Sequence, residues 1–131
     1  MGGALLVSPL APERFPDLPA IGGARFASAE AGVRHAGRVD VTLALLDPGT
    51  TVAGVFTRSS TRSAPVRDCE AKLRAGGAGG AAFLVNSGNS NAFTGQAGDA
   101  SVAALCAAVA RAAGVPEGRV FTASTGVIGE R

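Results

Sequence analysis

The five apolar residues at positions 81–85, Ala-Ala-Phe-Leu-Val, constrain the fold more than any other stretch of the sequence. Two glycine pairs precede them and a polar segment rich in Asn and Gly follows, so turn signals bound the run on both sides. A short run that is apolar at every position is typical of a strand buried on both faces. We therefore predict a central strand here, around which the other elements pack.

Strand-like and helix-like patterns alternate around this run. Residues 39–46 and 51–56 flank a Pro-Gly turn, which predicts an antiparallel hairpin. Ser63 is the predicted N-cap of one helix and Asp99 that of a second, and a last strand is predicted around Val120. This order predicts a mixed α/β fold, α+β in its arrangement of layers. The predicted core residues are Phe83, Leu84, Val102, Leu105, Cys106, Val109, Val120 and Phe121.

Charge and composition exclude several classes of function. The formal net charge is only +2, and the arginines are scattered without interleaved aromatic residues, so we expect no nucleic-acid partner. With only Cys69, Cys106 and a single histidine, His35, the chain has neither a disulfide framework nor a set of metal ligands. No stretch is long and apolar enough to span a membrane, and no nucleotide-binding glycine motif is present. We expect a cytoplasmic protein without a metal or other cofactor.

The polar stretch at residues 85–95, Val-Asn-Ser-Gly-Asn-Ser-Asn-Ala-Phe-Thr-Gly, allows two interpretations. Asn86, Asn89 and Asn91 can bond to their own backbone and, with the glycines, hold a complicated turn. Alternatively, the amide side chains and exposed N–H groups line a polar pocket where two strands end side by side. The residues alone leave both interpretations open.

A second informative stretch, Ser-Thr-Gly-Val-Ile-Gly-Glu at residues 124–130, follows the last predicted strand. Gly126 can adopt a positive φ and admit a ligand close to the backbone. A hydroxyl or amide donor at Thr125 and the amide of Gly126 would suit the developing negative charge of an acyl-transfer reaction. Taken as an isolated pair, Thr-Gly is more often a plain turn, by roughly ten to one.

With both stretches in view, the chain resembles the ornithine acetyltransferase family, the glutamate N-acetyltransferases of arginine biosynthesis that mature by autoproteolysis. Three stretches carry the resemblance, in the expected order: residues 52–57 with 63–66, then 85–95, then 124–130. Ser90 and Phe93 depart from the family pattern, where Ala and Cys are expected, and neither change removes a polar group needed for chemistry.

The resemblance implies a layered mixed-sheet α/β fold similar to that of self-processing aminopeptidases. It implies a precursor that cuts itself before a threonine, which then becomes the nucleophile at the start of a second chain. Acetylornithine would acetylate that threonine, and glutamate would take the acetyl group. Thr125 and Gly126 match the family's oxyanion-stabilising pair, so in this context the oxyanion hole is favoured over the plain turn.

Within that family, residues 1–131 correspond to the N-terminal portion of the first (alpha) chain, expected as a single, incomplete domain. Thr94 and Thr125 match neither the cleavage junction nor the nucleophile. We therefore expect a C-terminal (beta) chain as partner in a hetero-oligomer, and no activity from these residues alone. The alternatives are a non-catalytic binding remnant of the fold and a fragment of a related self-processing aminopeptidase. Whether acetyl-CoA is also a donor stays open.

Overall fold

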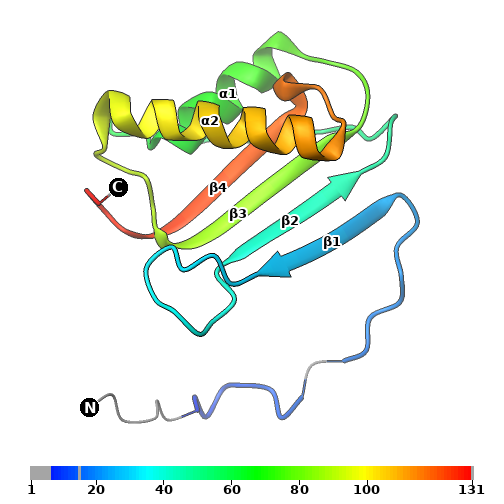
Figure 1. Cartoon of the computed structure of the whole chain (residues 1–131), viewed down its shortest axis with the longest axis vertical. Coiled ribbons are helices and arrows are strands. Elements are labelled where there is room, and N and C mark those ends of the chain that lie inside the picture. The colour runs from blue at the N-terminus through cyan, green and yellow to red at the C-terminus, as the bar shows by residue number, and fades with distance from the viewer. Residues whose placement is uncertain (1–6, 15, 131) are drawn as a thin grey trace.

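The computed structural model describes residues 7–14 and 16–130, which form one four-stranded sheet with two neighbouring helices packed against it (Figure 1). The strands are β1 (Ala24–Ala29), β2 (Val41–Leu46), β3 (Ala81–Asn89) and β4 (Val120–Val127). The helices are α1 (Ala64–Ala75), α2 (Gly95–Ala113) and the short 3₁₀ helix η1 (Glu117–Arg119). The mixed α/β fold expected from the sequence is confirmed.

The sheet has the order β1-β2-β3-β4, so strand β3 is central as predicted. β1, β2 and β3 are antiparallel neighbours, whereas β3 and β4 run parallel through the crossover helix α2. Ala81 and Ala82 at the start of β3 are fully buried, but Val85 is 40% exposed. The predicted central strand is therefore buried on both faces only in its first half.

The predicted hairpin of residues 39–46 with 51–56 is wrong. β2 pairs with β1 on one side and β3 on the other, so both of its edges are occupied. Residues 51–56 form no strand; they cross toward α1, where Val52 and Phe56 pack against a small core cluster that includes Phe121. The Pro-Gly turn is present, but the chain leaves it toward the helices instead of pairing back on the sheet.

Helix α1 lies along the outer edge of β4. The Lys72 ammonium donates to the Val120 carbonyl at 2.8 Å, and the Cys69 thiol donates to the Thr122 carbonyl at 3.4 Å. Both carbonyls belong to the edge strand, so α1 satisfies backbone acceptors that would otherwise have no ladder partner. This placement covers the first half of the β4 edge and leaves its second half for the site described below.

Helix α2 packs on β3 and β4 through the predicted apolar face, with one exception. Val102, Cys106 and Val109 are buried in the main core cluster, as predicted, together with Val120. Leu105, predicted as core, is 44% exposed. The face of α2 that contacts the sheet is therefore narrower than its apolar stripe.

The two helix starts agree with the sequence only in part. Ser63 is the N-cap of α1 as predicted, although its side chain makes no capping hydrogen bond. α2 begins at Gly95 with Thr94 as N-cap, five residues before Asp99, the N-cap expected from the sequence. Asp99 instead lies within the first turns of α2, where its carboxylate forms an ion pair with Arg67 of α1.

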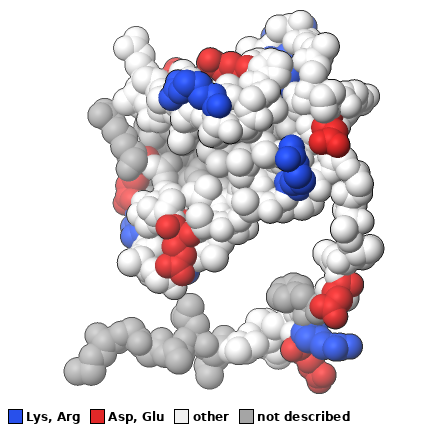
Figure 2. All heavy atoms as spheres, turned by 45° about the vertical axis from the view of Figure 1, so that its right-hand side comes forward, with Lys and Arg blue, Asp and Glu red and all other residues white. Residues whose placement is uncertain are grey.

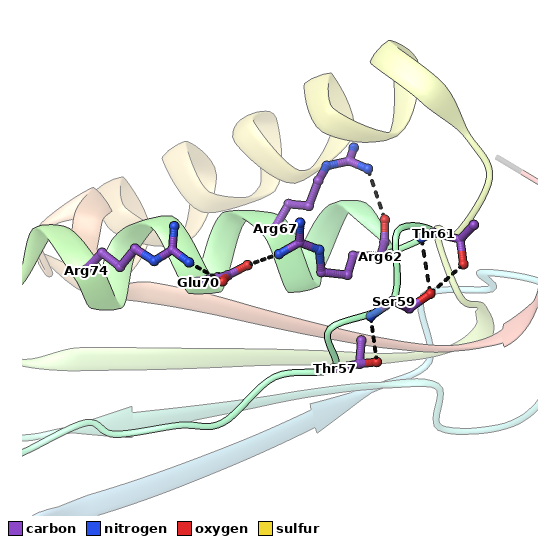
Figure 3. A network of polar contacts seen from close by, with 7 residues as sticks. All are labelled: Thr57, Ser59, Thr61, Arg62, Arg67, Glu70 and Arg74. Atoms are coloured by element: carbon purple, nitrogen blue, oxygen red, sulfur yellow. Dashed lines mark hydrogen bonds and ion pairs between the residues drawn. The ribbon is translucent and has the colours of Figure 1, made fainter.

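Polar side chains fasten the segment at residues 57–63 to helix α1 (Figure 3). Glu70 accepts from Arg62 and from Arg74, each at 2.5 Å. Within the segment, Ser59 and Thr61 share a hydrogen bond between their hydroxyls at 2.9 Å. These contacts fix the approach to the N-terminus of α1.

No helix in the described ranges is long and apolar enough to cross a membrane. On the face that Figure 2 shows, basic and acidic side chains are interspersed and form no continuous basic patch.

Candidate functional site

The two informative stretches of the sequence meet at a pair of glycines in neighbouring strands. Gly88 of β3 and Gly126 of β4 are directly in register, with φ values of 116° and 135°. A Cβ atom on Gly126 would lie 2.6 Å from the backbone nitrogen of Asn89, and closer still to the carbonyl of Gly88. The strands therefore approach each other here at a distance that only glycine permits.

This arrangement corrects the prediction that both stretches are loops. Residues 86–89 belong to β3 and residues 124–127 belong to β4, so Thr125 and Gly126 lie within a strand and not beyond its end. Gly88 and Gly126 favour a turn when the sequence alone is considered, because glycine is typical of turns. Here they instead allow two parallel strands to stay paired through unusual backbone angles.

The direction of the Gly126 amide follows from the hydrogen bonds along β4. Peptide groups of a strand point alternately to its two sides, and the Val127 carbonyl points toward β3 because it accepts from Ser90 at 3.0 Å. The Val120 and Thr122 carbonyls, an odd number of residues away, accept from α1 at the outer edge. By the same alternation, we infer that the Gly126 N–H points to the outer edge of the sheet.

The same alternation decides which group of Thr125 is available as a donor. Its N–H faces β3 and belongs to the ladder, so only its hydroxyl is available to a ligand. Thr125 and Gly126 are both exposed. The last β4 carbonyl that accepts from α1 is that of Thr122, so this pair lies beyond those contacts on the outer edge of the strand. The Gly126 amide at the edge thus has the exposed Thr125 side chain as its neighbour, and the hydroxyl of that side chain is the second candidate donor.

Hydrogen bonds join the two stretches to each other. The Asn86 amide oxygen is 2.6 Å from the Ser124 hydroxyl, and the Asn86 amide nitrogen donates to the Asn89 carbonyl at 3.0 Å. The Asn89 amide nitrogen donates to the Glu130 carbonyl at 2.7 Å. Asn91, at φ 48°, accepts from the Thr94 hydroxyl at 2.6 Å. The Asn86 and Asn89 amide nitrogens bond to the backbone, as the first interpretation of the Asn-rich stretch expects. Asn86, Asn89 and Asn91 also border a cavity of about 450 Å³, so these bonds leave the second interpretation open.

A loop that the sequence left without assignment supports this region from the α2 side of the sheet. The Asp40 carboxylate accepts from the N–H groups of Ala31 and Val33, at 2.7 and 2.6 Å, and so closes the connection between β1 and β2. In that loop, Arg34 lies against Gly88 and pairs with Glu130. The loop thus contacts both Gly88 and the C-terminal stretch, a role that no local pattern in residues 30–40 signals.

Replacing Asp40 with asparagine is expected to lower the thermal unfolding temperature by several degrees, because the two N–H groups bond to different carboxylate oxygens and asparagine would place an NH₂ donor against one of them. The hydrogen bond from Ala31, followed by that from Val33, holds the pKa of Asp40 below its usual range. A depressed carboxylate pKa stabilises the fold above the unfolded-state pKa, and this contribution disappears as the pH falls below about 4.

Calorimetry between about pH 5 and pH 3 checks this expectation. The wild type should lose stability more steeply than Asp40→Asn over that interval. Asp17→Asn, which changes an exposed carboxylate, serves as the control and should behave as the wild type. Parallel pH profiles for wild type and Asp40→Asn would contradict the role given to Asp40.

The cysteines are poor candidates for a catalytic nucleophile. Burial raises the pKa of Cys69 and of Cys106, and the Lys72 ammonium 3.0 Å from the Cys106 sulfur does not reverse the shift. Both side chains are therefore neutral thiols near pH 7. His35 lies exposed in the loop between β1 and β2. Over the described part of the chain, no group of three or more His, Cys, Asp or Glu side chains is placed to hold a metal ion.

The sequence of this chain is similar to those of known proteins of one family. The ArgJ family model matches residues 25–131. An arginine biosynthesis bifunctional protein ArgJ from Ruegeria pomeroyi is 68% identical over 124 residues, which cover 95% of this chain and 30% of that protein. The corresponding protein from Bradyrhizobium diazoefficiens is 56% identical with the same coverage. The chain thus spans about 30% of the length of these curated relatives.

Two crystal structures share the fold. An arginine biosynthesis bifunctional protein ArgJ from Bacillus halodurans superposes with a TM-score of 0.74 and 31% identity, over 83% of this chain and 56% of that one. An ornithine acetyltransferase from Mycobacterium tuberculosis, solved in complex with ornithine, gives a TM-score of 0.71 and 36% identity, over 84% of this chain and 59% of that one.

Proposed function

The chain belongs to the ArgJ family, and we propose on this basis that it forms part of an acyltransferase that moves an acetyl group from N-acetylornithine to glutamate. In this proposal residues 1–131 are the N-terminal portion of the first chain of that enzyme. The wider family supports a role in arginine biosynthesis, since the relatives are named for that pathway.

The observation that carries the proposal is that Thr125 and Gly126 are adjacent and exposed in the second half of β4. In acetyl transfer, a nucleophile attacks the acetyl carbonyl, and its oxygen takes up negative charge in the tetrahedral intermediate. The Thr125 hydroxyl and the Gly126 N–H would donate to that oxygen. Both residues are exposed, adjacent and part of a paired strand, which suits donors whose geometry must not change during the reaction.

The remaining steps need groups from other residues of the protein. Collapse of the first intermediate releases ornithine and leaves the acetyl group on the nucleophile. The amine of glutamate then attacks the same carbonyl, the same two donors stabilise the second intermediate, and N-acetylglutamate leaves. In the proposal the nucleophile is a threonine exposed by self-cleavage at the start of a second chain, and its free amine is the base. The site would act in the cytoplasm.

The experiment that tests this function is an assay of the full-length protein with N-acetylornithine and glutamate. We expect stoichiometric formation of ornithine and N-acetylglutamate. A parallel reaction with acetyl-CoA and glutamate decides whether a second donor is used, and one with short peptides tests the self-processing aminopeptidase alternative. If neither acetyl donor is consumed, the proposal fails, and binding of acetylornithine without turnover would favour the non-catalytic alternative.

A further inference from the structure

A buried arginine lies at the opposite end of β4 from the candidate oxyanion site. Arg119, the last residue of η1, is only 7% exposed. Its Nη2 donates to the Thr50 carbonyl at 2.6 Å, while its Nε has no hydrogen-bond partner. No carboxylate among the described residues lies within ion-pair distance of the guanidinium. Buried charges in proteins are paired almost without exception, so we expect an anion to pair with the Arg119 guanidinium.

Arg119 borders a cavity of about 410 Å³. Its walls come mainly from residues 49–52, from the glycine-rich segment at 76–79 and from the start of β4, and they contain no Asp or Glu. Lys72 also borders the cavity, but Asp68 at 2.7 Å already neutralises it. The cavity therefore carries one positive charge without a counter-charge.

The glycine-rich segment lies directly on Arg119. A Cβ atom on Gly77 would come within 3.1 Å of the Arg119 side chain, so the two residues are in close contact. The backbone N–H groups of residues 77–79 donate no hydrogen bond to any other described residue. Residues 77–79, with unpaired backbone N–H groups, and Arg119 thus border the same cavity.

We propose that this cavity is a binding site for the carboxylate group of a small molecule. The planar guanidinium matches a carboxylate in a paired hydrogen-bonding geometry. A single uncompensated charge suits a monoanion better than a phosphate. The volume lies in the range of small-molecule sites, about 300–1,000 Å³. Six residues of extended strand, about 20 Å, separate Arg119 from Thr125, so this site is distinct from the candidate oxyanion pair and does not depend on acetyl transfer.

Calorimetric unfolding of the full-length protein tests the site, with sodium acetate replacing sodium chloride at constant ionic strength. We expect the unfolding temperature to rise with acetate and to saturate, because a ligand that binds only the folded state stabilises it. Arg119→Lys keeps the charge but loses the planar fork, and should weaken the apparent acetate affinity about tenfold. Arg74→Lys, at an exposed arginine, should respond as the wild type does.

Two further comparisons complete the test. Thr125→Ala should retain the response to acetate, which separates this site from the candidate oxyanion pair. Inorganic phosphate should give no saturable rise. The proposal is overturned if the unfolding temperature is independent of acetate at fixed ionic strength, if Arg119→Lys responds as the wild type, or if phosphate acts as strongly as acetate. A flat response combined with a large loss of stability in Arg119→Lys would show instead that the protein supplies its own carboxylate.

Discussion

Gly126→Ala is expected to lower the free energy of unfolding by about 4 kcal/mol, the sum of about 1–3 kcal/mol of backbone strain and about 1–3 kcal/mol of overpacking. The strain arises because alanine disfavours the φ of 135°. The overpacking arises because the new methyl group would collide with the backbone of Gly88 and Asn89, which cannot move without breaking the β3–β4 ladder.

Gly49→Ala is the matched control for this change. Gly49 also has a positive φ, 93°, but a Cβ atom there would meet nothing within 4 Å. Its replacement should cost only the strain, about 1–3 kcal/mol. Urea unfolding of the two variants of the full-length protein gives the difference directly. Equal losses for Gly126→Ala and Gly49→Ala would show that the strands are not in close contact at the glycine pair.

Thr125→Ala should reduce kcat by about 10²- to 10³-fold, equivalent to about 2.7–4 kcal/mol of lost transition-state stabilisation. The threonine side chain is exposed, so the unfolding temperature should barely change. KM should also change little, because the donor acts on charge that develops only in the transition state. Steady-state kinetics with N-acetylornithine and glutamate provide all of these values.

Thr125→Ser separates the hydroxyl from the rest of the side chain. It retains the donor and should restore most of the rate lost in Thr125→Ala. If serine and alanine variants are equally slow, or if the rate falls only in proportion to the folded fraction, then Thr125 has a structural role and the hydroxyl is not a catalytic donor.

Local pattern predicted the elements that bury one continuous apolar face. The run at residues 81–85 identified the central strand, and the spacing of Val102, Cys106 and Val109 identified α2, because burial leaves a clear period in the sequence. The pairing of strands was not predictable in the same way. β2 pairs with β1 across a loop closed by Asp40. The sequence of residues 51–56 does not show that both edges of β2 are already paired with other strands.

The candidate site was likewise predictable from the sequence only in part. Thr125 and Gly126 were identified from their residue types together with the family resemblance, and their catalytic role stays a prediction. The sequence could not show that they lie within β4, because Gly88 and Gly126 have turn-like preferences that only the neighbouring strand overrides. It also left open which Thr125 group is the donor. The choice of the hydroxyl depends on the direction of the β4 ladder, which is fixed by Ser90 and by helix α1.

The most direct test of the central claim is a crystal structure of the full-length protein with N-acetylornithine bound. The acetyl oxygen should lie about 2.7–3.1 Å from both the Thr125 hydroxyl oxygen and the Gly126 nitrogen, at the outer edge of β4. An acetyl oxygen bound by other donors, with Thr125 and Gly126 covered by polypeptide, would contradict the account.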